Sequence, residues 1–328
     1  RLKPCFSLNC PCEFRRRARM LSKIAAAPQE LLARPGLLRA PAAVPAAVAG
    51  RLHAMLWEDL AREHRLERRR GGGWTAPARP DGRLYGPPPQ RLLESAPFAE
   101  LRAGLGRTLD ALFGAGAWRL DRQITTFADC PDLEGEPWTV PFGWHTDVKI
   151  IPGQPLPALA YAFVFLDRVE ARGGATMLLR GSGLRAQRLA GAVAKGGQTL
   201  KLALAAESAW LAELFGAHRL GRSCRDTSRE ASSAVLDQLD HASRARRLLG
   251  GGVVSRGVCL RVEELTGERG DVIVWDPRLL HSASRNVSAT PRSVLKFRVK
   301  LSCWRQQQLG LAAGRAAGEL GQRLEKKK

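Results

Sequence analysis

Residues 270–292 read GDVIVWDPRLLHSASRNVSATPR, and this stretch decides how the rest of the chain is interpreted. Gly270 and Asp271 are typical of a turn, and the apolar run that ends at Trp275 predicts a short β-strand. A histidine, His281, follows that strand, and Arg292 stands eleven positions after the histidine. The order of turn, strand, histidine and arginine is more specific than any single residue in it.

A second segment with chemical potential reads GWHTD at residues 143–147. In a strand, residues two positions apart point to the same face, so His145 and Asp147 are predicted to converge on one point. An imidazole and a carboxylate fill two corners of an octahedral site, and one more histidine completes the 2-His-1-carboxylate arrangement of non-haem Fe(II) oxygenases. We take His281 as the candidate for that third corner. The pair alone is weak evidence, because most such pairs are ordinary surface or hydrogen-bonded residues.

The spacing of apolar residues divides the remaining chain into helices and strands. Helical spacing predicts two amphipathic helices, at 44–60 and 98–112. Short apolar runs between turn residues predict strands at 119–127, 145–151, 159–166, 175–179, 258–263, 271–275 and 292–301. Helical spacing returns at about 184–257, which we interpret as an insertion. We therefore predict a mainly β fold with flanking helices, whose core is a double-stranded β-helix, or jelly roll.

Three blocks, at 143–149, 163–183 and 270–298, carry a resemblance to a known family. Together they resemble the phytanoyl-CoA dioxygenase family, whose members are Fe(II)- and 2-oxoglutarate-dependent oxygenases. The resemblance spans residues 36–305, is faint in the N-terminal helices and does not extend to the insertion. It implies that Fe(II), 2-oxoglutarate and O2 are required, and that ascorbate supports the activity.

The resemblance also assigns roles to residues. It makes His145, Asp147 and His281 the iron ligands, and Arg292 the clamp on the distal carboxylate of 2-oxoglutarate. A guanidinium suits that role because its planar fork matches a carboxylate bidentately and stays charged at any working pH.

Further positions of the family pattern concern the cosubstrate. Phe163 stands where the family tends to have an aromatic residue beside 2-oxoglutarate, although a phenylalanine in a strand is also ordinary core. Ala283 departs from the pattern, because a serine two residues after the distal histidine often helps to bind the cosubstrate. Ser282 and Ser288 are the candidates that compensate for it.

Alternation along 292–301 indicates which way the clamp points. Leu295, Phe297, Val299 and Leu301 share one face, so Arg292 lies on the other face, together with Val294. Two more cations, Lys296 and Arg298, share that second face, and we expect them to be solvated near its far end.

The implied reaction is hydroxylation of a C–H bond in a small organic or acyl substrate, an acyl thioester being one option, with release of succinate and CO2. Asp147 favours hydroxylation over halogenation, because related halogenases carry Gly or Ala at that position.

We expect the loops at 71–96 and 128–143 to form the walls of the mouth of the site. Two alternatives stay open: a nucleic-acid oxidative demethylase, suggested by the Arg292–Arg298 spacing, and a catalytically silent jelly-roll binding module.

Composition limits the remaining possibilities. The 328 residues include 52 Lys+Arg against 31 Asp+Glu, a net charge of +21 that suits a solvated basic surface or binding to a polyanion. No apolar run reaches the roughly 18 residues that span a bilayer. Seven cysteines in a chain of this size favour a reducing compartment over a disulfide framework, so we expect a cytoplasmic protein.

Both ends of the chain differ from its middle. Residues 1–35 are rich in arginine and poor in acidic residues, which predicts a basic leader or disordered tail and makes an organellar location the alternative. We expect the dioxygenase domain at 36–305 and a basic C-terminal tail at 306–328.

Overall fold

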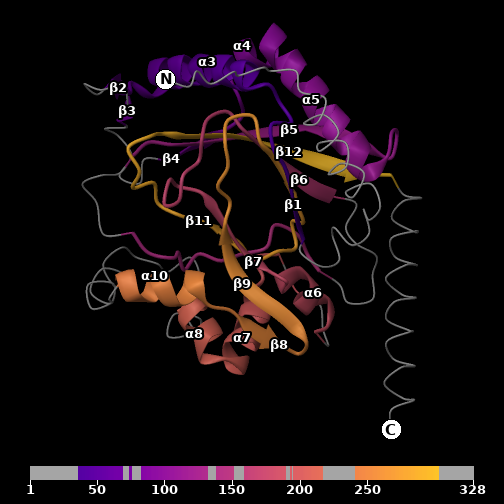
Figure 1. The fold of residues 1–328 in the computed structure, drawn as a ribbon, viewed down its shortest axis with the longest axis vertical. Helices are drawn as coiled ribbons and strands as arrows, with labels where there is room; N and C mark the ends of the chain where they lie inside the picture. The colour runs from indigo at the N-terminus through magenta and orange to yellow at the C-terminus, as the bar shows by residue number, and fades with distance from the viewer. Residues whose placement is uncertain are drawn as a thin grey trace, which may run out of the picture.

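The computed structural model describes residues 36–68, 74–75, 83–131, 138–150, 159–189, 193, 195–216 and 241–302. The predicted basic segments 1–35 and 306–328, and parts of the two predicted mouth loops, lie outside these residues. No helix within the described ranges is long and apolar enough to cross a membrane. The described chain forms two larger antiparallel sheets with helices on their outer sides, and a small two-stranded ribbon (Figure 1).

The larger sheet has six strands, and all neighbours in it are antiparallel. Its spatial order is β1 (Leu37–Ala40), β10 (Val272–Trp275), β6 (Leu159–Phe165), β12 (Arg292–Leu301), β5 (Trp118–Asp129) and β4 (Arg83–Gly86). The smaller sheet has four strands in the order β11 (His281–Ala283), β7 (Thr176–Arg180), β9 (Val258–Glu264) and β8 (Val253–Ser255). A two-stranded ribbon pairs β2 (Glu67–Arg68) with β3 (Trp74–Thr75).

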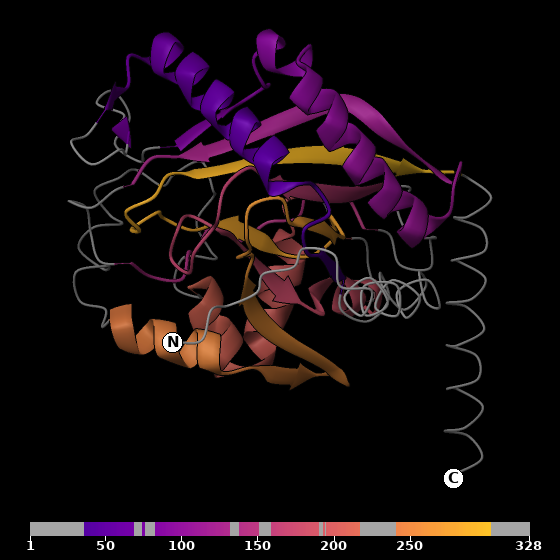
Figure 2. The same cartoon turned by 45° about the horizontal axis from the view of Figure 1, so that its top comes forward.

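Helices α3 (Ala46–His64) and α5 (Ala96–Phe113) cover the outer face of the larger sheet, with the short α4 (Gln90–Leu93) between them in sequence (Figure 2). The apolar stripe of α3 is formed by Val48, Leu52, Leu56 and Leu60. These side chains pack in one cluster with outward-facing residues of β12 such as Leu295 and Phe297. Helix α5 begins where the Ser95 hydroxyl accepts a hydrogen bond from Phe98 N and ends at Gly114. The two predicted N-terminal helices are therefore confirmed.

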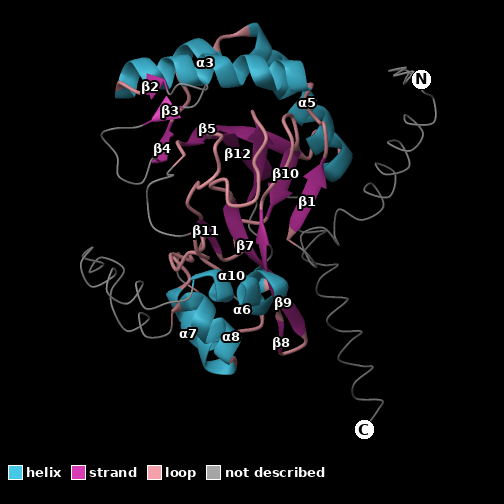
Figure 3. Cartoon of the chain, turned by 60° about the vertical axis from the view of Figure 1, so that its left-hand side comes forward, coloured by secondary structure: helices cyan, strands magenta, loops and turns pink. Residues whose placement is uncertain are grey.

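A second group of helices covers the outer face of the smaller sheet, and Figure 3 shows them below β7 and beside β9. They are α6 (Ser182–Gln187), α7 (Gln198–Glu207), α8 (Ala209–Phe215) and α10 (His241–Gly250). They belong to the segment predicted to be helical at 184–257, but the end of that segment differs from the prediction. Residues Val253–Ser255 form β8, because they pair with β9 across a tight turn at Arg256 and Gly257.

The inner faces of the two sheets meet in a third apolar cluster. Phe163 of β6, Trp275 of β10 and Val294 of β12 face it from the larger sheet, and Leu178 of β7 faces it from the smaller one. Val294 packs there while its neighbour Leu295 packs under the helices, as the predicted alternation requires. Arg292 and Lys296 lie two positions before and after Val294 on β12, so their side chains also point between the sheets.

Two local predictions are wrong. The segment 145–151 is not a strand: the described part of it makes single bridges at His145, to His281, and at Ile150, to Val193. Because these two partners belong to different parts of the fold, the chain bends between them and cannot continue as one strand. The segment 71–96 is not only loop, since its described residues include β3, β4 and α4.

Gly270, the first residue of the stretch 270–292, is required by the close packing of the backbone around it. Gly270 has φ +88°, and a Cβ atom there would overlap the backbone oxygen of Val44. In addition, the carbonyl oxygen of Gly270 accepts a hydrogen bond from Val44 N at 3.0 Å. Only glycine fits this close approach, which sets the start of β10 against the start of α3.

Candidate metal centre

Two segments that are far apart in the sequence join where the two predicted histidine ligands meet. His145 N donates to His281 O at 2.9 Å, and His281 N donates to His145 O at 2.9 Å. This antiparallel bridge fixes the loop that carries His145 against the first residue of β11. Asp147 N donates to Pro277 O at 3.3 Å, which ties the same loop to the turn that follows β10. The backbone thus brings the three predicted ligands together without the continuous strand that we predicted.

The three side chains converge on one point. Oδ1 of Asp147 lies 3.7 Å from Nε2 of His145 and 3.7 Å from Nε2 of His281. One ligand atom from each residue lies within 4.8 Å of the others, and no other group of three such residues converges in the described part of the chain. The ring centroids of the two histidines are 4.2 Å apart. The separation of the three donors suits one metal ion held from one side.

Backbone carbonyls orient both imidazoles. Nδ1 of His145 lies 3.0 Å from Gly143 O, and Nδ1 of His281 lies 2.9 Å from Leu279 O. A carbonyl only accepts, so each Nδ1 carries the hydrogen and each Nε2 keeps a free lone pair. Histidines that bind a metal through one ring nitrogen usually donate a hydrogen bond from the other. The donor set and its tautomers therefore fit a divalent transition metal.

Two groups hold the other side of the Asp147 carboxylate. Nζ of Lys296 lies 3.7 Å from Oδ2 of Asp147, and the Tyr161 hydroxyl hydrogen-bonds to the same carboxylate. The Lys296 ammonium also lies 4.6 Å from the ring centroid of Tyr161 and 5.2 Å from that of Phe127. The expectation that Lys296 is solvated is wrong, because its side chain is only 17% exposed and reaches across the interior to Asp147. Oδ1 thus faces the histidines while Oδ2 faces a cation.

Burial and local charge set the protonation of the centre. Burial, and then the neighbouring His145, lower the pKa of His281 to about 4. Burial works to raise the pKa of Asp147, but the charges of His281 and Lys296 outweigh it and hold that pKa below its usual value. Burial lowers the pKa of Lys296, and the charge of Asp147 opposes that change. The metal-free centre accordingly favours a neutral His281 beside an ionised Asp147, which are the forms that bind metal.

Arg292, the predicted clamp, is buried at the start of β12 with only 1% of its side chain exposed. Its Nη1 donates to Gly174 O at 2.6 Å and to Oδ2 of Asp129 at 3.2 Å, and its Nη2 donates to Thr176 Oγ1 at 3.0 Å. Nε of Arg292 is buried and has no hydrogen-bond partner among the described residues. A buried donor without a partner is costly, so this nitrogen fits a ligand that brings an acceptor.

Asp129 is a neighbour of the clamp that the sequence did not single out. Its side chain is 2% exposed, and Arg83 Nε lies 4.0 Å from its Oδ1. The Tyr85 hydroxyl also hydrogen-bonds to this carboxylate. Burial raises the pKa of Asp129 above its usual value, while the charges of Arg292 and Arg83 oppose that rise. The clamp therefore carries a carboxylate partner of its own.

The other predicted cosubstrate residues lie in different surroundings. Phe163 is buried between the sheets, with its ring centroid 5.5 Å from that of Trp275. Ser282 is buried next to His281 in β11. The Ser288 hydroxyl lies 2.8 Å from Asn286 Oδ1. Phe163 thus lies one aromatic ring away from His281. Ser282 is paired with Met177 and points to the strand face opposite to His281, and Ser288 is engaged within its own loop.

Sequence reasoning missed several residues around the site. Trp275 meets His281 edge-on at 4.8 Å between ring centroids, and Thr176 bonds the clamp from β7. The sequence around Trp275 and Thr176 gives no sign of these contacts, because the contacts depend on how strands from the two sheets align. Only the apolar strand pattern that contains them was visible.

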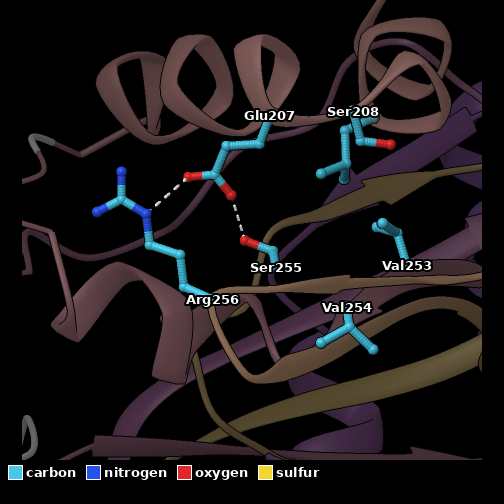
Figure 4. A pocket seen from close by; sticks show the side chains of 7 residues that line it. Glu207, Ser208, Val253, Val254, Ser255 and Arg256 are labelled. Atoms are coloured by element: carbon cyan, nitrogen blue, oxygen red, sulfur yellow. Dashed lines mark hydrogen bonds and ion pairs between the residues drawn. The ribbon is translucent and has the colours of Figure 1, made fainter.

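A pocket elsewhere on the chain is separate from this centre. It has a volume of about 230 Å³ and lies where α7 and α8 meet the β8–β9 turn. Figure 4 shows Glu207 at its edge, paired with Ser255 and with Arg256 Nε at 3.4 Å. None of the triad residues lines this pocket.

Comparison with known proteins agrees with the metal centre. Residues 259–294 match the family model described as Phytanoyl-CoA dioxygenase (PhyH), a stretch that includes His281 and Arg292. The resemblance predicted from the sequence is thereby confirmed for this stretch, which overlaps the last of its three blocks. The match and the triad agree with the class that the sequence predicts, a 2-oxoglutarate-dependent non-haem iron oxygenase. No curated protein matches the chain.

Several solved structures are similar to the chain at low sequence identity. The epimerase SnoN, in complex with Fe3+, alpha ketoglutarate and nogalamycin RO, is 15% identical, with 86% of this chain and 84% of that chain covered and a TM-score of 0.47. The carbocyclase SnoK from nogalamycin biosynthesis is 15% identical, with 84% and 85% covered and a TM-score of 0.45. HygX from Streptomyces hygroscopicus, with nickel and 2-oxoglutarate bound, is 11% identical, with 83% and 85% covered and a TM-score of 0.44.

Proposed function

We propose that this protein is a dioxygenase that hydroxylates a C–H bond of a small organic substrate and converts 2-oxoglutarate to succinate and CO2. The observation that carries the proposal is the convergence of His145, Asp147 and His281, with one donor atom from each within 4.8 Å of the others. Three protein donors on one side of an ion leave its remaining positions for ligands that react.

In this proposal His145, Asp147 and His281 hold Fe(II), and Arg292 holds the distal carboxylate of 2-oxoglutarate. When bound, iron, 2-oxoglutarate and O2 supply the oxidation, in which the keto acid loses CO2 and one oxygen atom enters the C–H bond. The carbonyls of Gly143 and Leu279 keep the imidazoles oriented. Phe163, Ser282 and Ser288 are the further residues proposed near the cosubstrate, and ascorbate is proposed as a supporting reductant.

The identity of the carboxylate residue supports hydroxylation. Asp147 fills the corner that an exogenous anion such as chloride needs in a halogenating site. Its Oδ1 faces both histidines at 3.7 Å, which suits a ligand of the metal. We therefore propose that the oxygen atom, and no halide, is transferred to the substrate.

We also propose that the fold is a double-stranded β-helix. Two antiparallel sheets that face each other across an apolar layer are consistent with a double-stranded β-helix. We propose that 36–305 is one dioxygenase domain, with 184–257 as an insertion over the smaller sheet. The loops 71–96 and 128–143 are proposed as walls of the mouth, and a large part of each lies outside the described residues.

Arg298, which motivated the nucleic-acid alternative, is engaged within the sheet. Its Nη1 donates to Gln123 Oε1 at 2.5 Å, and its Nε lies 3.8 Å from Asp121 Oδ2. Because this guanidinium already has partners on β5, we favour a small molecule over a nucleic acid. Filter binding to single-stranded DNA checks this choice, since phosphate contacts predict a steep loss of binding with added salt.

The proposed function is tested by a turnover assay with a matched inactive variant. Purified protein is supplied with Fe(II), ascorbate and 2-oxoglutarate, with and without a panel of small carboxylates and acyl thioesters, and succinate is measured. We expect succinate above the level of Asp147→Ala, and more of it when a substrate is present. Equal succinate from both proteins across the panel, with Fe(II) shown to bind, would favour the silent binding module.

A further inference from the structure

The clamp region contains three charges in one row across the larger sheet. The backbone register sets Arg292 of β12 opposite Asp129 of β5, and the same Asp129 opposite Arg83 of β4. Directly opposed residues of antiparallel strands project to the same face. The row of Arg83, Asp129 and Arg292 is therefore fixed by the sheet and does not depend on a flexible loop.

Asp129 engages one end of the guanidinium, at Nη1, while Nε has no partner among the described residues. Its Oδ2 lies 3.2 Å from Nη1 of Arg292, and both side chains are almost fully buried, at 2% and 1% exposure. A carboxylate and a guanidinium form the same charge-assisted hydrogen bonds whether the carboxylate belongs to the protein or to a ligand. An incoming carboxylate must therefore compete with the internal one.

Other contacts keep the guanidinium in place without Asp129. Gly174 O and Thr176 Oγ1 both accept from Arg292, at 2.6 Å and 3.0 Å, and neither carries a charge. Loss of the Asp129 charge would therefore leave the orientation of Arg292 largely intact while removing the repulsion between Asp129 and an anionic ligand.

We propose that Asp129 is an internal counter-ion that competes with 2-oxoglutarate for Arg292 and so lowers the affinity of the site for its cosubstrate. This inference rests on the proposed function. Asp129 is a positioning residue in this account, because it acts on the cosubstrate through Arg292.

The test is calorimetric binding of 2-oxoglutarate to the protein loaded with Ni(II), which takes the place of iron without turnover. We compare the unchanged protein with Asp129→Asn and with the control Asp121→Asn. Asp121 lies on the same strand and pairs with Lys300 at 3.0 Å, away from the clamp, so the control removes the same charge at a distance. Pyruvate is the second probe, because it has the keto acid group but lacks the distal carboxylate.

We expect Asp129→Asn to bind 2-oxoglutarate about tenfold more tightly and pyruvate with unchanged affinity, and Asp121→Asn to change neither. If the unchanged protein binds 2-oxoglutarate and Asp129→Asn binds it equally or more weakly, the inference is wrong and the proposed function stands. If none of the proteins binds 2-oxoglutarate although all bind Ni(II), the proposed function fails, and the inference fails with it. Thermal unfolding checks the fold of each variant, and Asp129→Ser, with the same expected direction, replaces Asp129→Asn if the latter does not fold.

Discussion

The metal centre and the clamp are built in opposite ways. The triad is partly open, with 46% of the His145 side chain and 22% of the Asp147 side chain exposed against 8% of that of His281. The clamp is closed, with 1% of Arg292 exposed and a protein carboxylate already paired with it. The centre therefore presents lone pairs to an ion that arrives from outside, whereas the clamp must exchange one partner for another. We infer that metal binding needs little rearrangement and that cosubstrate binding needs more.

The largest effect is expected from removal of the carboxylate ligand. Asp147→Ala leaves two imidazoles and no negative charge, so we expect affinity for Fe(II) to fall by more than about 100-fold and succinate formation to reach background. Equilibrium dialysis with Fe(II) under anaerobic conditions measures the affinity. Asp121→Asn is the control for loss of one acidic side chain, and unchanged metal affinity in Asp147→Ala would contradict the ligand assignment.

Changes at the clamp should affect cosubstrate and stability but not metal. Arg292→Lys keeps the charge but loses the fork, so we expect 2-oxoglutarate affinity to fall by about 100-fold with metal affinity retained. Arg292→Met removes the nearer cation of the buried Asp129 and leaves only Arg83, 4.0 Å away, so it should destabilise the protein by about 3 kcal/mol. Urea unfolding of Arg292→Met and of Arg292→Met/Asp129→Asn checks this. The double variant should recover part of the loss, and a double variant no more stable than the single one would refute the role of the buried charge.

Acid should weaken the metal-free protein through His281. The pKa of its imidazole is lowered to about 4 in the folded chain, against an ordinary value of 6.5, so the unfolded chain binds more protons between these values. The free energy of unfolding is therefore highest above pH 6.5. It falls as the pH drops toward 4, by roughly 3 kcal/mol for this imidazole.

Urea unfolding of the metal-free protein at a series of pH values measures this slope. His281→Gln should flatten it, while His64→Gln, at the end of α3, should leave it unchanged. An identical slope in the unchanged protein and in His281→Gln would show that other groups cause the acid sensitivity.

The smallest effects are expected from the two serines. Ser282→Ala should weaken 2-oxoglutarate binding a few-fold, as loss of one hydrogen bond does. Ser288→Ala should do less, because its hydroxyl already contacts Asn286 at 2.8 Å. Calorimetry on the Ni(II)-loaded proteins ranks the two, and a larger loss in Ser288→Ala would reverse the ranking.

The sequence predicted what ligand chemistry and periodicity determine. His145 and Asp147 were singled out by their spacing and His281 by the resemblance to the family, and α3 and α5 were predicted because their apolar stripes repeat with helical spacing. The short strands β1, β4 and β11 were missed because three or four residues show no clear period. The Arg83–Gly86 strand is also surrounded by glycine and proline, which indicate a loop.

The surroundings of the site were not predictable in the same way. Asp129 lies beside Arg292 only because β5 and β12 pair in one register, which no local pattern determines. Lys296 was expected in solvent because it is charged, yet its ammonium contacts Asp147 between two aromatic rings. Both residues are set by pairing between distant strands, and the sequence carries that information only through the whole fold.

Anaerobic absorption spectroscopy tests the central claim most directly, because an α-keto acid chelated to Fe(II) gives a charge-transfer band in the visible range. Fe(II) is added to the protein and 2-oxoglutarate is then titrated. We predict that the band grows to saturation with one 2-oxoglutarate per chain and does not form in Asp147→Ala. A protein that binds Fe(II) but gives no band at any 2-oxoglutarate concentration, or a band of equal strength in Asp147→Ala, would contradict the account.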